Sequence, residues 1–577
     1  MINGRKIYNH IHIYLIFILL FLIIILSFSP SFFGKNLKGF SINNKDIFPG
    51  YILFTPEYST ETLLIDRLGD VYHSWDSRYL QGMAVYLLEN GDIVRSCLPF
   101  INPKFISGGI TGCVEKYDWN STLLWEFVYS NDQYCLHHDI EPMPNGNILM
   151  VGWEVKSKEE AIQKGRDPNL LPYNEFWPDH VIEVEPNGIN GGNIVWEWHV
   201  WNHLIQDYDS SKDNYGNVAD YPELIDINFG RLPFRGDFNH INSIDYNEEF
   251  DQILLSASAQ SEIWVIDHST TTEEAAGHTG GNSGKGGDIL YRWGNPISYR
   301  AGTDQDKMLF TQHDAQWIEP NCPGEGNILV FNNGNNRPGQ DYSSIDELVP
   351  PADAYGNYYL EPDTKYGPED FLWSYETDFY ANHLSGVHRI ESGNSLICNG
   401  PFGRFSEVNA EKEIIWKYTN PYPNIYQNNV FKIRHYTSDY PGLINLLYQP
   451  IKPSTPNGPS SALVNEVCTY STSSIDPQDN QVFYKFDWGD GTNSGWLGPY
   501  PSGKEIAVNH TWEIEMSYII KVRAKDEFGY LSVWSDPLNL NIPRLKERSN
   551  YYSINLFKFF PDFKNFIFII EFLLENH

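Results

Sequence analysis

Gly146-Asn-Ile-Leu149 is one of six copies of a short pattern that decides the fold of this chain. The other copies are Gly50-Tyr-Ile-Leu53, Gly91-Asp-Ile-Val94, Asp251-Gln-Ile-Leu254, Gly326-Asn-Ile-Leu329 and Gly393-Asn-Ser-Leu396. Each copy is followed by a strand that ends in tryptophan, namely Trp75, Trp125, Trp196, Trp293, Trp373 and Trp416. A unit of roughly 40–50 residues with several short strands and Gly or Asn turns is typical of a propeller blade. The sequence therefore predicts an all-β fold with a six-bladed β-propeller over residues 48–447.

Four of the six copies are preceded by a histidine at a matching place: His138, His240, His313 and His383. Each follows a polar residue, namely His137, Asn239, Gln312 and Asn382. We expect the Gly/Asn strand to be the first of its blade and to line the central channel, so that the histidines lie at the channel mouth. A single histidine beside a strand is usually structural, but repeats have no need for a titratable group at one place in four units. The pattern predicts a functional site there.

The composition excludes some classes of partner and cofactor. A formal charge of −34 over 577 residues argues against nucleic acid, because phosphate binding needs Lys and Arg patches. The six cysteines form no CxxC pair, so we expect no zinc or redox site, and their disulfide pairing stays open. No cofactor or metal is predicted. The glycine-rich stretch 277–287 lacks the Gly-Lys-Ser/Thr ending of a phosphate loop and is predicted to be a flexible hairpin tip.

Both ends of the chain are strongly apolar. Residues 13–34 carry no charged side chain, and Arg5 and Lys6 precede them. That run is long enough to span a bilayer, so residues 1–34 are predicted to be a signal anchor, with a cleaved signal peptide as the alternative. Either reading places the body of the protein outside the cytoplasm, anchored to a membrane or secreted. Residues 544–577 form a hydrophobic tail that Lys558, Asp562 and Lys564 interrupt.

A Pro/Ser-rich linker near residue 450 separates a second domain, predicted at residues 461–543. It contains Phe486-Asp-Trp-Gly-Asp-Gly-Thr492, His510-Thr-Trp512 and an alternating strand from Tyr518. Alternating strands joined by a tight Gly turn predict a small β-sandwich. These motifs closely resemble the polycystic-kidney-disease (PKD) repeat, an extracellular immunoglobulin-like module. The resemblance implies a spacing or adhesion role.

The propeller resembles the arylsulfotransferase family, the PAPS-independent aryl sulfate sulfotransferases. The segments that carry the resemblance are His137-His-Asp-Ile-Glu-Pro142, Asn239-His-Ile-Asn-Ser243, Gln312-His-Asp-Ala-Gln-Trp317 and Arg434-His-Tyr-Thr-Ser-Asp-Tyr-Pro-Gly-Leu443. The resemblance implies six blades and sulfuryl transfer from a phenolic sulfate ester to a phenol through a sulfohistidine. It implies that His313 is the nucleophile and that His138 (or His137) and His240 hold the sulfate oxygens and protonate the leaving phenol. His137, His383, Arg404 and Gln312 are the predicted substrate-binding residues.

The sequence departs from the family pattern at one position. The pattern expects an arginine that contacts the sulfate at the end of the strand after Asn239-His-Ile-Asn-Ser243, and here Ser258 occupies that place. A fixed positive charge opposite a transferring sulfuryl group contributes to transition-state stabilisation. Arg404 and Arg95 are the candidates to replace it, and a surface or inter-blade ion pair is the structural alternative for each.

Three other readings stay open. The chain could be a non-catalytic cell-surface binding or adhesion protein built on the same propeller. A quinone-dependent dehydrogenase would need eight tryptophan-docked blades, and only six copies occur. The histidine cluster could also bind a transition metal, although no carboxylate constellation lies near it in the sequence.

Overall fold

The protein is described from a computed structural model, which covers residues 42–43, 47–230, 235–362, 364–447, 449–532 and 534–543. The predicted anchor at 1–34 and the hydrophobic tail at 544–577 lie outside these ranges. Among the residues covered, no helix has both the length and the apolar character needed to cross a membrane. The chain divides into two units, Met1–Leu446 and Leu447–His577.

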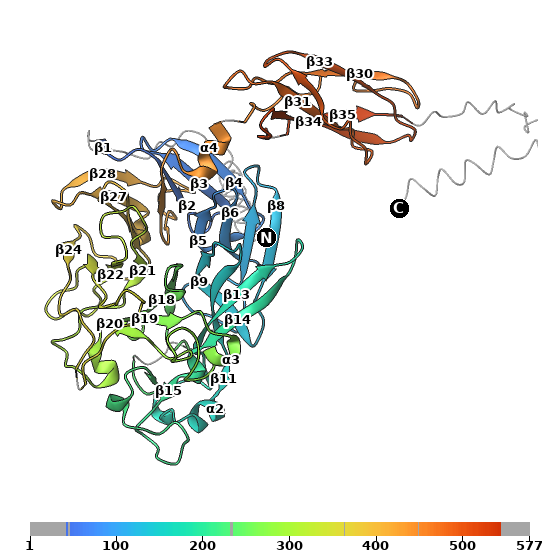
Figure 1. Cartoon of the computed structure of the whole chain (residues 1–577). Helices are drawn as coiled ribbons and strands as arrows, with labels where there is room; N and C mark the ends of the chain where they lie inside the picture. Colours follow the sequence, from blue (N-terminus) through green and yellow to red (C-terminus); the bar gives the residue numbers. More distant parts are fainter. Residues whose placement is uncertain are drawn as a thin grey trace, which may run out of the picture. The chain divides into compact units, whose positions relative to one another are not determined.

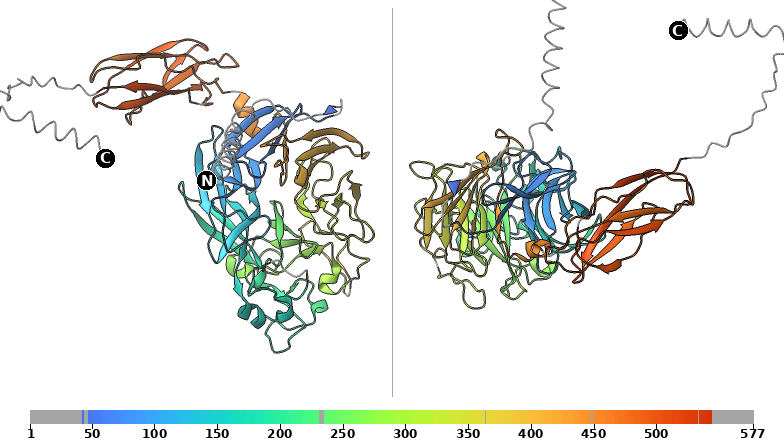
Figure 2. Two further views of the ribbon diagram at one scale, coloured as in Figure 1. Left: turned by 180° about the vertical axis from the view of Figure 1, so that it is seen from behind. Right: turned by 90° about the horizontal axis from the view of Figure 1, so that it is seen from above.

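The first unit is a propeller of six antiparallel four-stranded blades (Figures 1 and 2). Blades 1 to 3 are, from the inside outward, β29 (Arg434–Tyr436), β2 (Tyr51–Phe54), β3 (Glu61–Asp66) and β4 (Val71–Asp76); β5 (Leu80–Leu87), β6 (Ile93–Leu98), β7 (Cys113–Tyr117) and β8 (Leu123–Val128); and β9 (Tyr134–Pro142), β10 (Ile148–Glu154), β13 (Asp179–Pro186) and β14 (Gly192–His199). Blades 4 to 6 are β17 (Ile241–Asn247), β18 (Gln252–Ala257), β19 (Glu262–Asp267) and β20 (Tyr291–Trp293); β21 (His313–Trp317), β22 (Ile328–Asn332), β23 (Ser344–Leu348) and β24 (Trp373–Glu376); and β25 (Gly386–Arg389), β26 (Ser395–Asn399), β27 (Arg404–Val408) and β28 (Ile414–Thr419), with β1 (Ile42–Asn43) added outside β28.

The repeated strand occupies a different place in the blade from the one its sequence predicted. The Gly/Asn strands are the second strand of each sheet, and the innermost strand is the one that carries or follows the histidine. The prediction of six blades is confirmed, whereas the prediction that the Gly/Asn strand lines the channel is wrong. Fully buried strands such as β18 and β22 are apolar on both faces, so their sequence does not say which neighbour is inner. In consequence, the histidines stand beside the channel-lining strands themselves.

The closing tryptophans join neighbouring blades. Four of the six donate an indole N–H to the next blade: Trp125 to the Gly191 carbonyl, Trp196 to the Thr270 hydroxyl, Trp293 to the Pro368 carbonyl and Trp416 to the Arg67 carbonyl, over 2.6–3.1 Å. Tryptophan suits this position because it buries a large apolar surface and still presents one polar group. The repeat that identifies the blades is therefore also part of what packs them together.

The ring closes between the two ends of the propeller sequence. Strand β29 pairs antiparallel with β2, and blade 1 is thereby completed by a strand from the end of the unit. In Figure 1 the blue strands β2 and β3 lie beside the brown β27 and β28, where the ring begins and ends. A propeller closed in this way leaves no open sheet edge between its first and last blades.

Short elements lie in the segments outside the blade strands. These elements are β11 (Lys156–Ser157), α2 (Lys158–Gln163), η2 (Pro168–Leu170), β12 (Glu175–Phe176), η3 (Val200–Asn202), β15 (Leu204–Ile205), η4 (Val218–Asp220), β16 (Ile225–Asp226), α3 (Thr272–Ala275), η5 (Pro296–Tyr299), η6 (Gly400–Phe402) and α4 (Pro441–Leu447). Helices α2 and α3 each begin with a complete capping box, Ser157 with Glu160 and Thr271 with Glu274.

The second unit is a β-sandwich. One sheet pairs β30 (Cys468–Thr472) with β33 (Ile506–His510), and the other has the order β32 (Leu497–Tyr500), β31 (Val482–Asp487), β34 (Ser517–Asp526) and β35 (Leu538–Asn541). Its two sequence motifs meet in space, because the Asp490 carboxylate lies 2.8 Å from His510 Nε2 and the His510 ring stacks on Trp488. The predicted all-β class, a propeller followed by a small sandwich, is confirmed.

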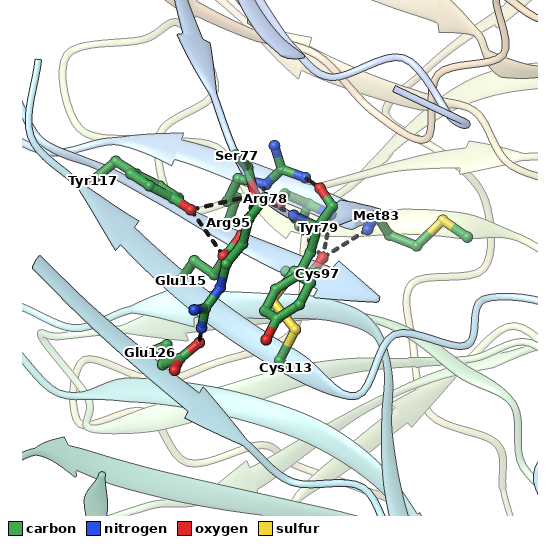
Figure 3. The surroundings of a disulfide bond; sticks show 12 residues. Ser77, Arg78, Tyr79, Met83, Arg95, Cys97, Cys113, Glu115, Tyr117 and Glu126 are labelled. Carbon is green, nitrogen blue, oxygen red and sulfur yellow. Dashed lines mark hydrogen bonds and ion pairs between the residues drawn. A yellow bond between two sulfur atoms is a disulfide. The ribbon is translucent and has the colours of Figure 1, made fainter. Parts of the chain in front are cut away.

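One disulfide lies in blade 2, where Cys97 of β6 is bonded to Cys113 of β7, while the other four cysteines are buried thiols (Figure 3). Arg95 is fully buried on the same strand as Cys97. Its guanidinium donates to the carbonyl oxygens of Thr60 and Tyr79 and lies 3.9 Å from the Glu115 carboxylate. These contacts join blades 1 and 2 and correspond to the structural alternative for this arginine.

An ion-pair bridge links blades 3 and 4. His268 Nδ1 lies 2.6 Å from Asp251 Oδ1, and its Nε2 lies 3.1 Å from Glu183 Oε2. Burial by itself lowers the pKa of His268, but the hydrogen bonds and charges of these two carboxylates outweigh it and raise the pKa to about 9. The protonated histidine is therefore preferred in the folded chain.

Replacing His268 by Gln should destabilise the propeller in a pH-dependent way. The folded pKa exceeds the unfolded value of about 6.5, so the bridge contributes fully below about pH 6.5 and is lost as pH rises through 9. We expect a loss of up to about 3 kcal/mol near pH 6 and almost none near pH 10. Urea unfolding at both pH values measures it. His73→Gln is the control. Burial lowers the pKa of His73 to about 4, so this variant should show no loss of stability that is confined to low pH. An equal effect of His268→Gln at both pH values would contradict the assignment.

Candidate active site at the channel mouth

Three of the predicted histidines gather where the innermost strands of blades 3, 4 and 5 begin. The ladder between the first and second strands shifts register in each of these blades, close to His138, His240 and His313. His138 and His240 have φ angles of 53° and 52°, and Asp314, beside His313, has 51°. A bulge with one left-handed residue turns a side chain out of the regular alternation. These bulges take the imidazoles out of the regular side-chain alternation of the inner strands.

The orientation and tautomer of His313 are fixed by Asn333. His313 Nδ1 lies 2.7 Å from Asn333 Oδ1. The Asn333 amide nitrogen donates to the carbonyl oxygens of Ala381, at 2.8 Å, and Leu384, at 3.0 Å, so its oxygen must face the histidine. An amide oxygen only accepts, hence His313 carries its proton on Nδ1 and keeps a lone pair on Nε2.

His313 is also neutral. Its side chain is almost completely buried, and burial together with nearby His240 lowers its pKa to about 3. The ring centroid lies 6.4 Å from that of Phe431, a fully buried side chain that is also 6.0 Å from His138. An uncharged imidazole with an available Nε2 lone pair is the nucleophilic form of histidine.

His240 is paired with a buried carboxylate. Its Nδ1 lies 2.6 Å from Asp237 Oδ2, which also accepts from the Ser107 hydroxyl at 2.7 Å, while Asp237 Oδ1 accepts from the Trp153 indole at 3.0 Å. Burial alone would raise the pKa of Asp237, but the charge and hydrogen bond of His240 outweigh it and lower the pKa to about 2. The carboxylate stays ionised and fixes the His240 tautomer, with a proton on Nδ1.

His138 lies against both His240 and His137. Its ring centroid is 4.6 Å from that of His240, and its Nδ1 is 2.9 Å from His137 Nδ1. Burial holds the pKa of both His137 and His138 well below the usual value, so both rings are neutral and one of the two Nδ1 atoms donates to the other. His137 stacks on Trp153 at 3.9 Å and lies behind His138. It acts as a support for the His138 ring.

The other predicted substrate-binding residues lie in different surroundings. His383 is exposed, and its Nδ1 lies 2.6 Å from the amide oxygen of Asn382. Gln312 is fully buried and donates to the Ser256 hydroxyl and the Glu262 carbonyl. Arg404 is exposed at the start of β27, with its guanidinium over the Phe402 ring. Their predicted roles stay predictions.

Ser258, which stands where the family pattern has an arginine, is 3% exposed and directly follows β18. Sequence reasoning missed the residues that position the histidines, Asn333 and Asp237, and the buried Phe431 beside them. A cavity of about 570 Å³ also went unpredicted. Its wall includes Thr311, two residues before His313, together with Lys307, Asn335 and Tyr380. No repeat or motif marks these positions, which come from several loops.

The fold and the site define a β-propeller protein with a buried histidine cluster at the mouth of its channel. The chain belongs to the arylsulfotransferase (ASST) family, whose model matches residues 52–490. No curated protein sequence matches the chain with significance.

Among solved structures, the chain is similar to streptogramin B lyase, at 11% identity and a TM-score of 0.31, over 67% of this chain and 87% of that one. It is similar to regucalcin from Agrobacterium tumefaciens, a calcium-binding protein, at 8% identity and a TM-score of 0.27, over 67% and 97%. The PKD domain of an M14-like peptidase from a Thermoplasmatales archaeon matches at 32% identity and a TM-score of 0.16, over 17% of this chain and 97% of that one.

His313 should be observed as the Nδ1–H tautomer and should not titrate above about pH 4, one unit above its pKa of about 3. Nitrogen-15 spectra of the histidine-labelled chain measure both properties, and the His313→Ala spectrum identifies the signal. His199, which lies on outer strand β14, provides the contrast, because its pKa is raised by Glu154 and Glu197 against the effect of burial. A His313 resonance that titrates near pH 6.5, or that carries its proton on Nε2, would contradict the Asn333 assignment.

Proposed function

We propose that the protein is an aryl sulfate sulfotransferase that moves a sulfuryl group from a phenolic sulfate ester to a phenol through a sulfohistidine at His313. The observation that carries this proposal is the neutral His313 ring, held by Asn333 with its Nε2 lone pair available, beside the His240–Asp237 pair. Family membership supports the reaction class. No metal, nucleotide or other cofactor takes part in the proposed steps.

The first half-reaction needs one nucleophile and one acid. The His313 Nε2 lone pair attacks sulfur, an N–S bond forms, and the bond from sulfur to the aryl oxygen breaks. The leaving phenoxide takes a proton from Nε2 of protonated His240, whose Nδ1 stays bonded to Asp237. His138, 4.6 Å from His240 between ring centroids, is placed to donate to a sulfuryl oxygen.

The second half-reaction returns the site to its starting state. The acceptor phenol gives its proton to neutral His240 while its oxygen attacks sulfur, and the N–S bond breaks to restore the His313 lone pair. Donor and acceptor thus use the same acid–base group in turn, which gives ping-pong kinetics. The cavity beside Thr311 is the proposed place for the aryl groups, with Lys307 as a cation on its wall.

We further propose that the reaction takes place outside the cytoplasm. The Cys97–Cys113 disulfide supports an oxidising compartment, and the apolar run at 13–34 supports export or anchoring.

Replacing His313 by Ala should remove both the covalent adduct and turnover. We expect a fall of more than about 1,000-fold, because the variant has no nucleophile at that position. Intact mass after brief exposure to p-nitrophenyl sulfate measures the sulfuryl adduct, and phenol-dependent release of p-nitrophenol measures turnover. His138→Ala and His240→Ala should slow turnover by about 100- to 1,000-fold, the cost of losing one pre-positioned donor.

The matched control is His199→Ala, which removes a histidine from the outer strand of blade 3 and should keep full activity. Full turnover in His313→Ala would reject the assigned nucleophile. A wild-type chain that forms no adduct with several aryl sulfates would favour the alternative of a binding protein.

Asn333→Asp should give the reaction an acid limb that the wild type lacks. A carboxylate next to His313 Nδ1 stabilises the imidazolium and raises its pKa by about 1–3 units, and a protonated His313 cannot attack sulfur. Activity of this variant should therefore fall as pH drops through about 5, whereas wild-type attack continues to lower pH. The pH profile of kcat/KM measures the difference. Asn321→Asp, which adds the same charge on an exposed turn of blade 5, should leave the profile unchanged; identical profiles for Asn333→Asp and wild type would contradict the role of Asn333.

A further inference from the structure

Three side chains that can bind a metal ion, two from histidines and one from an aspartate, converge at blade 4. The proposed reaction uses none of them. His203 Nδ1 lies 2.9 Å from Asp288 Oδ1, and His278 Nδ1 lies 2.7 Å from the same oxygen. One ligand atom of each residue lies within 4.8 Å of the other two. Over the part of the chain that the structure covers, no other group of His, Cys, Asp and Glu meets this condition.

The two ring nitrogens of His203 have different partners. His203 Nε2 lies 2.9 Å from the Ala275 carbonyl oxygen. A carbonyl only accepts, so Nε2 carries the proton and Nδ1 of the neutral ring has a lone pair. That lone pair lies 2.9 Å from a carboxylate oxygen of Asp288, and two lone pairs at that distance repel each other. Either a second proton on His203 or a metal ion must stand between them.

The buried ligand, His203, is held in place by its packing without a bound metal ion. The His203 side chain is fully buried and stacks on Trp198 with an angle of 8° between the rings. The Trp198 indole donates to the Gly287 carbonyl at 2.7 Å. A Cβ atom at residue 287 would lie 2.0 Å from the Ala275 carbonyl oxygen, so only glycine permits this close approach. A histidine that binds a metal through one ring nitrogen usually donates a hydrogen bond from the other ring N–H, often to a backbone carbonyl.

The third ligand faces solvent. The His278 side chain is 59% exposed and forms part of the wall of a cavity of about 680 Å³. This arrangement gives an ion a path from solvent and leaves a coordination position for water. Two imidazoles and one carboxylate with an open fourth position match the preference of zinc and similar divalent metals.

We propose that His203 Nδ1, His278 Nδ1 and Asp288 Oδ1 bind one divalent transition-metal ion of the zinc type. The ion joins His203, in the segment after η3, to the glycine-rich stretch 277–287, which the sequence predicted to be a flexible tip. The bound metal orders that stretch and adds a cross-link between residues 85 apart in the chain. The site is separate from the channel histidines and does not depend on the proposed sulfuryl transfer.

Zinc binding to the metal-free full chain tests the proposal. Isothermal titration after chelator treatment should show one site with a Kd of about a micromolar or tighter, and cobalt should give the visible bands of tetrahedral coordination. His278→Ala should weaken binding by at least about 100-fold, and Asp288→Asn should do the same. Lys285→Ala, an exposed change in the same glycine-rich stretch, should bind like the wild type.

Three results would overturn the proposal. Wild-type binding weaker than about 0.1 mM would mean that a proton, rather than a metal, separates His203 from Asp288. Unchanged affinity in His278→Ala would place the metal elsewhere. Binding lost in His313→Ala but kept in His278→Ala would assign the ion to the channel histidines.

Discussion

The buried ammonium group of Lys432 is the interaction on which the rest of the propeller depends. Its Nζ donates to the Tyr86 hydroxyl at 2.6 Å and to Asp139 Oδ2 at 2.7 Å, and lies 3.7 Å from Asp314 Oδ1. Asp139 also accepts from the backbone N–H of Ile244, and Asp314 from that of Val387. The group thereby joins the inner strands of blades 2 to 6 to the segment that leads into β29 of blade 1. Breaking a buried pair of this kind costs about 3–5 kcal/mol, because the remaining charge has no partner.

The contacts of Lys432 also help to position the histidine cluster. Lys432 holds the segment that also carries Phe431, the side chain against which both His138 and His313 lie. The ion pairs of Lys432 thus hold the inner strands together. Near the histidines, bulges interrupt the ladder between the first and second strands, and the imidazoles turn out of that ladder. Left-handed residues such as His138 and His240 store backbone strain, which persists only in a frame that is otherwise over-determined. The hydrogen bonds and ion pairs around Lys432 provide that frame, and the imidazoles would need little rearrangement when a ligand binds.

The sequence predicted those features of the fold that depend on local patterns repeated in each blade. A glycine turn precedes the second strand in five of the six blades, Asp251 takes its place in blade 4, and a closing tryptophan follows in all six, so the blade count follows from them. His383 shows the limit of this reasoning. It aligns with the other three histidines in sequence and helps to lower the pKa of His313, but it precedes β25, which pairs with β26 without a register shift, and its side chain is exposed. Asn333 and Lys432 could not be found because their partners are distant in the sequence: His313 lies 20 residues from Asn333, and Asp139 lies 293 residues from Lys432. Asp237 lies only three residues before His240, but no repeat or motif marks it.

The proposed reaction has to stabilise an anionic sulfate ester in a strongly acidic chain that has Ser258 where the family pattern has an arginine. Two of the three histidines at the proposed site, His138 and His313, are neutral, and the third, His240, is hydrogen-bonded to the ionised Asp237 carboxylate. In a loose transition state, the transferring group carries little additional negative charge and the leaving phenoxide carries most of it. The positive charge is then needed at the aryl oxygen rather than at the sulfuryl oxygens. In the proposed reaction, a proton from His240 would neutralise that oxygen directly, a task for which a fixed guanidinium would provide only an electrostatic field.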